Sequence, residues 1–158
     1  MLKREFKGFV EANRLQFYVE RAGDGPNLFY ISGTGGDLRN KPNQLDSPLA
    51  KHFNLMCFDQ RGLGQSTKPA GEYSMADYAD DAAALLDQLD DAPVRVIGVS
   101  YGGMVAQELA LRYPDKIRAL ALICTSAGGR GRPSFPLHEL ETMAPADRVK
   151  RHLQISDT

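Results

Sequence analysis

The segment Val94–Met104, which reads Val-Arg-Val-Ile-Gly-Val-Ser-Tyr-Gly-Gly-Met, constrains the fold of this chain more than any other. Its β-branched start predicts a buried strand, and a helical pattern follows it. Between the two lies Gly98-Val99-Ser100-Tyr101-Gly102, the glycine-x-serine-x-glycine pattern of a sharp strand–turn–helix connection called a nucleophile elbow. Such a turn strains the serine backbone and excludes side chains two positions before and after it. Ser100 is therefore the candidate nucleophile.

Strand and helix patterns alternate from residue 28 onward. This alternation predicts an α/β fold, with a mostly parallel sheet flanked by helices. The predicted strands are Phe6–Glu11, Leu15–Arg21, Leu28–Ile31, Asn54–Phe58, Val94–Val99 and Ala119–Cys124, and the predicted helices are Ser74–Asp90 and Gly103–Tyr113. A less regular stretch contains a short helical pattern at Ser47–His52.

The helix predicted at Ser74–Asp90 carries an apolar face and an acidic one. Ser74 can cap it, with Asp77 three residues further on. The remaining acidic residues fall off the apolar face and are expected to be solvated. They are Asp80, Asp81, Asp87 and Asp90.

Length and composition fit one soluble globular domain with a substantial core. The chain has 158 residues, 25% of them charged, and a formal net charge of −1. This near-neutral balance gives no electrostatic case for a nucleic-acid or membrane partner, and no apolar run is long enough to span a bilayer. The first five residues are not expected to begin a signal peptide, because no apolar stretch follows them. The two cysteines, Cys57 and Cys124, lie in apolar runs and are expected to be free and buried, which favours a reducing, cytoplasmic setting.

The loop after the strand Leu28–Ile31 is the candidate oxyanion-binding loop. It reads Ser32-Gly33-Thr34-Gly35-Gly36, and its glycines allow the backbone to turn towards Ser100. We expect the N–H groups of Thr34 and Tyr101 to hold the oxyanion, with Gly35 as the alternative to Thr34. A simple flexible loop is the competing interpretation.

Three charged residues near this edge of the sheet are expected to have no catalytic role. Asp59 and Arg61 lie in the glycine-punctuated loop that follows Phe58, where a carboxylate can bind backbone N–H groups and an arginine can bridge carbonyls. Asp37 is expected to be a solvated loop residue.

Taken together, three motifs resemble those of the α/β-hydrolase superfamily. They are Ser32–Gly36, Asp59–Ser66 and Gly98–Met104, and the resemblance runs from about residue 5 to about residue 128. Within the superfamily the chain is similar to small esterases, enol-lactone hydrolases and cofactor-free haloperoxidases. The resemblance implies an acyl-enzyme on Ser100, with no metal and no organic cofactor. Many members carry histidine where this chain has Ser32.

The family order of catalytic residues is serine, then acid, then histidine, and we expect the acid and the histidine to lie outside this chain, so neither is assigned. His138 and His152 are expected on the surface of short polar helices at Leu137–Met143 and Ala146–Ile155. Asp147 and His152 would lie about 140° apart around a helix axis. His52 precedes a core strand, in the wrong part of the chain.

The predicted domains are a hydrolase core over residues 1–128 and a linker with the start of a lid over residues 129–158. The glycine-rich Gly128–Pro133 marks the linker. We expect this chain to be an incomplete part of the enzyme, whose sheet edge beside Ala119–Cys124 is left unpaired. Completion by another chain or by exchange between protomers is the alternative, and the oligomeric state stays open.

The expected function is hydrolysis of small carboxylic esters or lactones. Haloperoxidase or perhydrolase activity at the same site is one alternative, and a non-catalytic ligand-binding protein is another. A nucleotide-binding dehydrogenase fits poorly, because the glycines after Ile31 lack the dinucleotide fingerprint.

Overall fold

The computed structural model of the protein describes residues 5–89, 92–127 and 137–156. The chain divides into two compact units, Met1–Ser126 and Ala127–Thr158. The first unit contains the strands β1 (Phe6–Ala12), β2 (Leu15–Ala22), β3 (Asn27–Ile31), β4 (Asn54–Phe58), β5 (Val94–Val99) and β6 (Ile117–Ile123). Its helices are α1 (Met75–Leu89) and α2 (Tyr101–Arg112), with the 3₁₀ helices η1 (Gln44–Asp46), η2 (Pro48–Lys51) and η3 (Pro114–Lys116).

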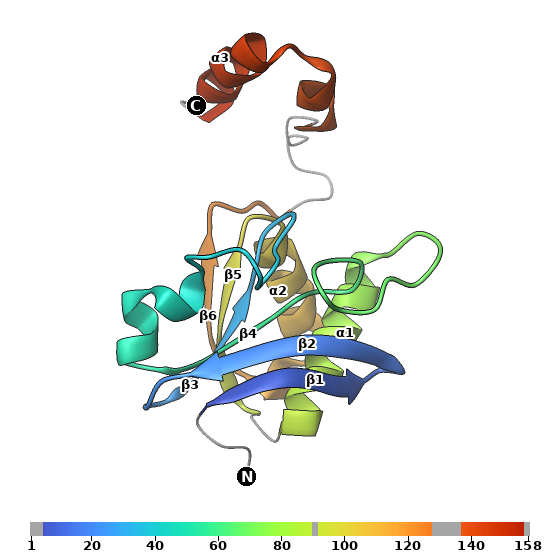
Figure 1. Ribbon diagram of the computed structural model, residues 1–158. Helices are drawn as coiled ribbons and strands as arrows, with labels where there is room; N and C mark the ends of the chain where they lie inside the picture. Colours follow the sequence, from blue (N-terminus) through green and yellow to red (C-terminus); the bar gives the residue numbers. More distant parts are fainter. Residues whose placement is uncertain (1–4, 90–91, 128–136, 157–158) are drawn as a thin grey trace. The chain divides into compact units, whose positions relative to one another are not determined.

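The six strands form one sheet in the order β1-β2-β4-β3-β5-β6 (Figure 1). The strands β4, β3, β5 and β6 run parallel, whereas β1 and β2 are added antiparallel at one end. The tight turn between β1 and β2 places Asn13 and Arg14 at positive φ (45° and 62°), as a two-residue hairpin turn requires. The predicted α/β fold with a mostly parallel sheet is confirmed.

Each face of the sheet packs against a different layer. Phe17, Phe29, Val96 and their neighbours pack with α1 and α2 on one face, while Tyr30, Leu55 and Cys57 pack with Leu45 and Leu49 of η1 and η2 on the other. Figure 1 shows α1 and α2 together on one side of the sheet and the η1–η2 segment on the opposite side. The helices bring small residues into this core: Ala79, Ala82, Ala83 and Ala106 are buried.

Helix α1 begins as its sequence predicts, but its acidic face is not uniformly solvated. The Ser74 hydroxyl accepts a hydrogen bond from Asp77 N–H at 3.2 Å, and the Asp77 carboxylate accepts one from Ser74 N–H at 2.8 Å. Asp81, expected in solvent, is 1% exposed. The expectation was wrong because Arg61, from the loop after β4, reaches this carboxylate and pairs with it.

The edge strand β6 is exposed along almost its whole length. Burial of its apolar run was expected and is wrong, whereas the unpaired sheet edge expected at this strand is present among the described residues. Leu120, Leu122 and Ile123 are 37%, 44% and 44% exposed, and Leu111 of α2 is 79% exposed. β6 pairs with β5 on one side and ends the sheet on the other. Cys124, expected in the same buried run, follows β6 and is also exposed, whereas Cys57 is buried as predicted.

The second unit contains η4 (Leu137–Thr142) and α3 (Pro145–Ser156), close to the two predicted polar helices. The predicted linker Gly128–Pro133 and Asp90 lie outside the described residues. Among the residues that the structure describes, no helix combines the length and apolar character needed to cross a lipid bilayer.

Candidate active site

The topology brings two loops together at the carboxyl edge of the sheet. From β3 the chain continues to β4 on one side, and β5 lies on the other side of β3. After β5 the chain continues to β6, on the opposite side from β4, so the loops after β3 and β5 start next to each other and turn to opposite sides. Parallel sheets bind their ligands in the crevice between two such loops. Here the two loops carry Ser32–Gly36 and Ser100.

Ser100 has the strained backbone expected of an elbow. Its φ is 54° and its ψ is −122°, a backbone conformation that residues other than glycine rarely adopt. Two bonds to the segment at and after β6 hold it there: Ser100 N–H donates to Ile123 O at 2.9 Å, and Thr125 Oγ1–H donates to Ser100 O at 2.7 Å. Because neighbouring elements fix both backbone groups of Ser100, the strain persists in the folded state.

Glycine is required at Gly98 and Gly102 for steric reasons. A methyl at Gly98 would lie 2.6 Å from both the Ala106 methyl and Gly102 O. A methyl at Gly102 would collide with the carbonyl oxygens of Ile31 and Ser32, at the end of β3. These close approaches explain the glycine-x-serine-x-glycine pattern and bring the end of β3 against the start of α2.

The loop after β3 forms a tight turn against Ser100. Gly36 N–H donates to Gly33 O at 3.2 Å, and Gly35 has a φ of 72°. A methyl at Gly33 would lie 3.2 Å from Ser100 Cβ, so this backbone passes next to the serine. Thr34 lies in the same turn and is exposed. The roles of Thr34 and Tyr101 as oxyanion donors stay predictions, with Tyr101 N–H at the first position of α2, where helices lack an internal acceptor.

An aromatic cluster supports the Tyr101 side chain. The Tyr101 ring meets the Tyr78 ring edge-on at 5.4 Å, and Tyr78 meets Tyr73 in the same way at 6.0 Å. Burial and the Tyr78 hydroxyl raise the pKa of Tyr101, so its phenol stays neutral at physiological pH. The Arg61 guanidinium lies 5.6 Å from the centre of the Tyr73 ring. This cluster links the elbow to α1.

Asp59 and Arg61 have the structural roles predicted for them. The Asp59 carboxylate is fully buried and accepts from Leu38 N–H and Gln65 N–H, both at 2.8 Å. Burial raises the pKa of Asp59, and these two N–H donors act in the opposite direction. Arg61 differs in its partner: it binds the Asp81 carboxylate through Nε and Nη2, at 2.5 and 2.7 Å, rather than backbone carbonyls.

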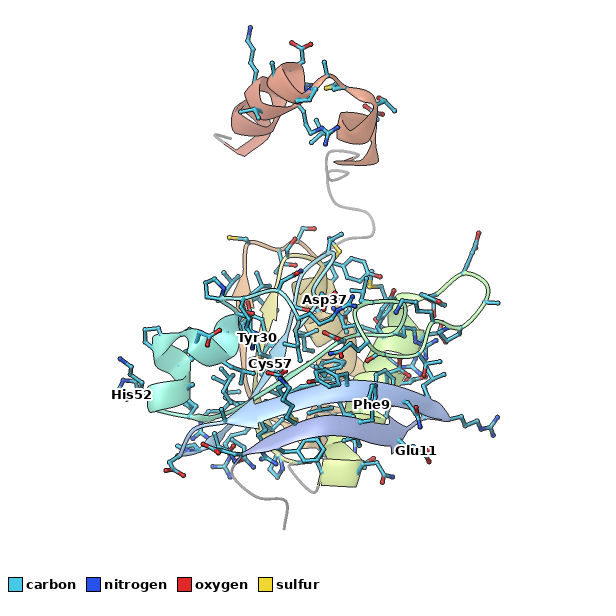
Figure 2. All side chains as sticks on the ribbon, viewed as in Figure 1. Phe9, Glu11, Tyr30, Asp37, His52 and Cys57 are labelled. Atoms are coloured by element: carbon cyan, nitrogen blue, oxygen red, sulfur yellow. The ribbon has the colours of Figure 1, made fainter. Side chains whose placement is uncertain are left out.

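Asp37 and His52 lie far from each other in Figure 2. Asp37 is paired with Arg39 at 2.6 Å and its side chain is 16% exposed, so it is less solvated than expected. Hydrogen bonds from Arg39 lower the pKa of Asp37 to about 2. His52 follows η2 and precedes β4, which places it at the amino edge of the parallel strands, opposite Ser100.

Among the described side chains, His52 is the single histidine, because those of His138 and His152 lie outside that set. In the same described part, no group of three or more His, Cys, Asp or Glu side chains is arranged to hold a metal ion. Gln60 was not singled out on the sequence, yet it donates to Ser32 O at 2.9 Å, at the start of the turn beside Ser100. Only its position after Asp59 in a strand-end loop could have drawn attention to it.

This chain is similar in sequence to two curated proteins and in structure to a third protein, all of them named as enzymes. BpoC of Mycobacterium tuberculosis, which carries the name non-heme bromoperoxidase, is 38% identical over 111 residues, covering 70% of this chain and 40% of BpoC. The 3-oxoadipate enol-lactonase 2 of Acinetobacter baylyi is 32% identical, covering 66% and 39%. The structure of Est816, an N-acyl homoserine lactone degrading enzyme, matches with a TM-score of 0.67 and 28% identity, covering 87% and 49%.

These relatives are longer proteins: the chain spans about 40% of the length of the curated relatives named above. The family described as alpha/beta hydrolase fold matches residues 26–151, most of the chain. Sequence, topology and comparisons thus agree, and the chain belongs to the alpha/beta hydrolase fold family.

Proposed function

We propose that this protein hydrolyses small carboxylic esters or lactones through an acyl-enzyme on Ser100. The observation that carries the proposal is the geometry of the elbow. Ser100 has a φ of 54° at the end of β5, and the Ser32–Gly36 turn passes against it. The similarity to an enol-lactonase and to the lactone-degrading Est816 supports this substrate class.

In the proposed reaction, Ser100 Oγ attacks the carbonyl carbon and its proton passes to a general base. The carbonyl oxygen becomes an oxyanion, which accepts hydrogen bonds from Thr34 N–H and Tyr101 N–H. Collapse of the tetrahedral intermediate releases the alcohol, or opens the lactone ring, with return of the proton. Water then attacks the ester on Ser100 and releases the acid. The general base comes from outside the described side chains, because His52 lies at the opposite edge of the sheet.

A fluorophosphonate probe tests the nucleophile directly, since it phosphonylates activated serines. In the form of the protein that supplies the general base, we expect one adduct per chain by intact mass, and none in Ser100→Ala. Ser74→Ala is a matched control, because Ser74 is an exposed serine that caps α1 away from the elbow. A folded protein that contains the base but forms no adduct, or an adduct that persists in Ser100→Ala, would contradict the proposal.

Perhydrolysis is a second candidate, favoured by the 38% identity to BpoC. Here Ser100 forms an ester with acetic acid and releases water; hydrogen peroxide then attacks this acetyl ester, releasing peracetic acid and the free serine. The peracid then oxidises bromide to hypobromous acid and becomes acetic acid. Peroxide-dependent bromination in acetate buffer that disappears in Ser100→Ala would support this activity. Ester hydrolysis without bromination would reject it.

A further inference from the structure

Gln60 is a fully buried glutamine beside the candidate active site, with only half of its carboxamide bonded. It is 0% exposed, and its Nε2–H donates to Ser32 O at 2.9 Å. Its Oε1 has no hydrogen-bond partner among the described residues. A buried amide oxygen without a partner is unfavourable, and leucine would fill a similar volume without that cost. The contribution of Gln60 at this position is therefore the hydrogen bond from its Nε2–H to Ser32 O.

Asp59 and Gln60 together hold the chain at the start of the turn and shortly after it. Gln60 binds the first residue of the turn at Ser32 O, and the Asp59 carboxylate accepts from Leu38 N–H at 2.8 Å, two residues beyond Gly36. The pair is itself held in place: the Ser66 hydroxyl donates to Asp59 O at 2.6 Å. Two consecutive residues of the loop after β4 thus hold the neighbouring loop on both sides of its glycine-rich part.

The segment between these two attachments needs such restraint. It contains Gly33, Gly35 and Gly36, and a glycine backbone has more freedom to lose than any other. Around Gly35 there is open space, with nothing within 4 Å of an added methyl. A planar peptide points its C=O and N–H in opposite directions, so fixing Ser32 O also fixes the direction of Gly33 N–H. The next N–H along the turn is that of Thr34.

We propose that Gln60 is a positioning residue that orients the Ser32–Gly36 turn so that its N–H groups face the oxyanion formed at Ser100. The inference rests on the proposed function for the identity of that oxyanion. Its structural part, the restraint of the turn by the Gln60 carboxamide, can be measured without turnover. A donor fixed in advance stabilises the transition state without reorganisation, whereas a mobile donor does not.

Amide hydrogen exchange, followed by NMR, measures how firmly Gln60 holds the Ser32–Gly36 turn. In Gln60→Leu we expect the protection of Gly36, whose N–H donates to Gly33 O across the turn, to fall by about tenfold, the factor that corresponds to one hydrogen bond, while α2 keeps its protection. Gln16→Leu is the matched control, because Gln16 is an exposed glutamine whose carboxamide makes a single bond to Glu11. Unchanged protection of the turn in folded Gln60→Leu would overturn the proposal.

Gln60→Glu separates positioning from mere packing, because it keeps the shape and makes the donor depend on pH. The introduced carboxyl can donate to Ser32 O when protonated but only accept when ionised. We expect wild-type protection of the turn at low pH, lost as pH rises through a pKa that burial has raised. The wild type and Gln60→Leu should show no such transition. Its absence in a folded Gln60→Glu would also overturn the proposal.

The rate of phosphonylation of Ser100 then tells the two proposals apart. If the wild type reacts, Gln60→Leu should react more slowly, and Gln60→Glu should follow the same pH transition as its exchange data. If the wild type does not react but the exchange pattern is as expected, the proposed function fails, whereas the restraint of the turn by Gln60 is supported. Normal reactivity of a Gln60→Leu variant with a loosened turn would refute the link between turn order and Ser100.

Discussion

The buried ion pair between Arg61 and Asp81 gives the sharpest stability prediction for this protein. Asp81 is 1% exposed, and its carboxylate accepts from Arg61 Nε and Nη2 and from Asn13 Nδ2, at 2.5, 2.7 and 2.7 Å. Arg61 has one further anionic contact, with Asp77 at 3.4 Å. The substitution Asp81→Ala would therefore leave a buried guanidinium with only this longer contact.

The expected loss follows from these contacts. Removing one partner of a buried ion pair costs about 3–5 kcal/mol of unfolding free energy. Alanine in a helix interior returns about 0.5 kcal/mol relative to aspartate, and the remaining Asp77 contact keeps the loss at the lower end. We expect Asp81→Ala to lower the unfolding free energy by about 3 kcal/mol. The double variant Arg61→Leu/Asp81→Leu should lose less than Asp81→Ala, because it leaves no unpaired buried charge.

Urea unfolding followed by circular dichroism measures both effects, with Asp80→Ala as the matched control. Asp80 is the preceding residue of α1, and its ion pair with Arg112 is exposed, with side-chain exposures of 36% and 40%. Surface pairs of this kind contribute about 0–1 kcal/mol, so Asp80→Ala should be close to neutral. A loss below about 1 kcal/mol for Asp81→Ala, at an unchanged slope, would refute the reasoning. A double variant less stable than Asp81→Ala would do the same.

Three further predictions concern surface and titrating groups. Iodoacetamide should alkylate one thiol per native chain, at exposed Cys124, because Cys57 is buried and its pKa is raised to about 12; two alkylated thiols by mass would contradict this. The Asp37 carboxylate should titrate near 2 by carbon NMR, and near its usual 3.8 in Arg39→Gln; since its pKa is lowered in the fold, its contribution to stability is present above 3.8 and lost as pH falls through about 2. Leu122→Lys should reduce binding of an apolar dye and self-association at equal stability, and unchanged dye binding would show that β6 is not the apolar surface involved.

Much of the fold could be predicted because its signals are local. The helix at α1 has a cap and an apolar stripe, and the Ser100 turn needs glycine at Gly98 and Gly102 for contacts that the pattern itself encodes. The apolar run of β6 predicts burial, whereas the unpaired sheet edge beside it was expected from the catalytic residues that the resemblance leaves unassigned, and β6 does end the sheet and is exposed. Periodicity reports what a segment could bury, whereas exposure depends on every other element of the fold.

The remaining errors concern partners that are distant in sequence. Asp81 was expected in solvent because its helix position suggests it, but Arg61 lies 20 residues away and reaches it through the fold. Gln60 bonds a carbonyl 28 residues away, and neither residue carries a local signal of that contact. Charged and amide side chains are ambiguous on sequence, because the same residue is a surface group or a buried tether according to its partner.

The buried alanines Ala79, Ala82 and Ala83 of α1, with Ala106 of α2, set a limit on how this protein can vary. They lie in the apolar core shared by the helices and the sheet, and α2 begins at the residue after Ser100. A valine or leucine at any of them would push α2 outward and tilt the elbow by a small amount. In a scan of all single substitutions, these positions should lose Ser100 reactivity while the protein still accumulates. The variants that lose Ser100 reactivity would then lie in the buried core, at positions that do not contact the substrate.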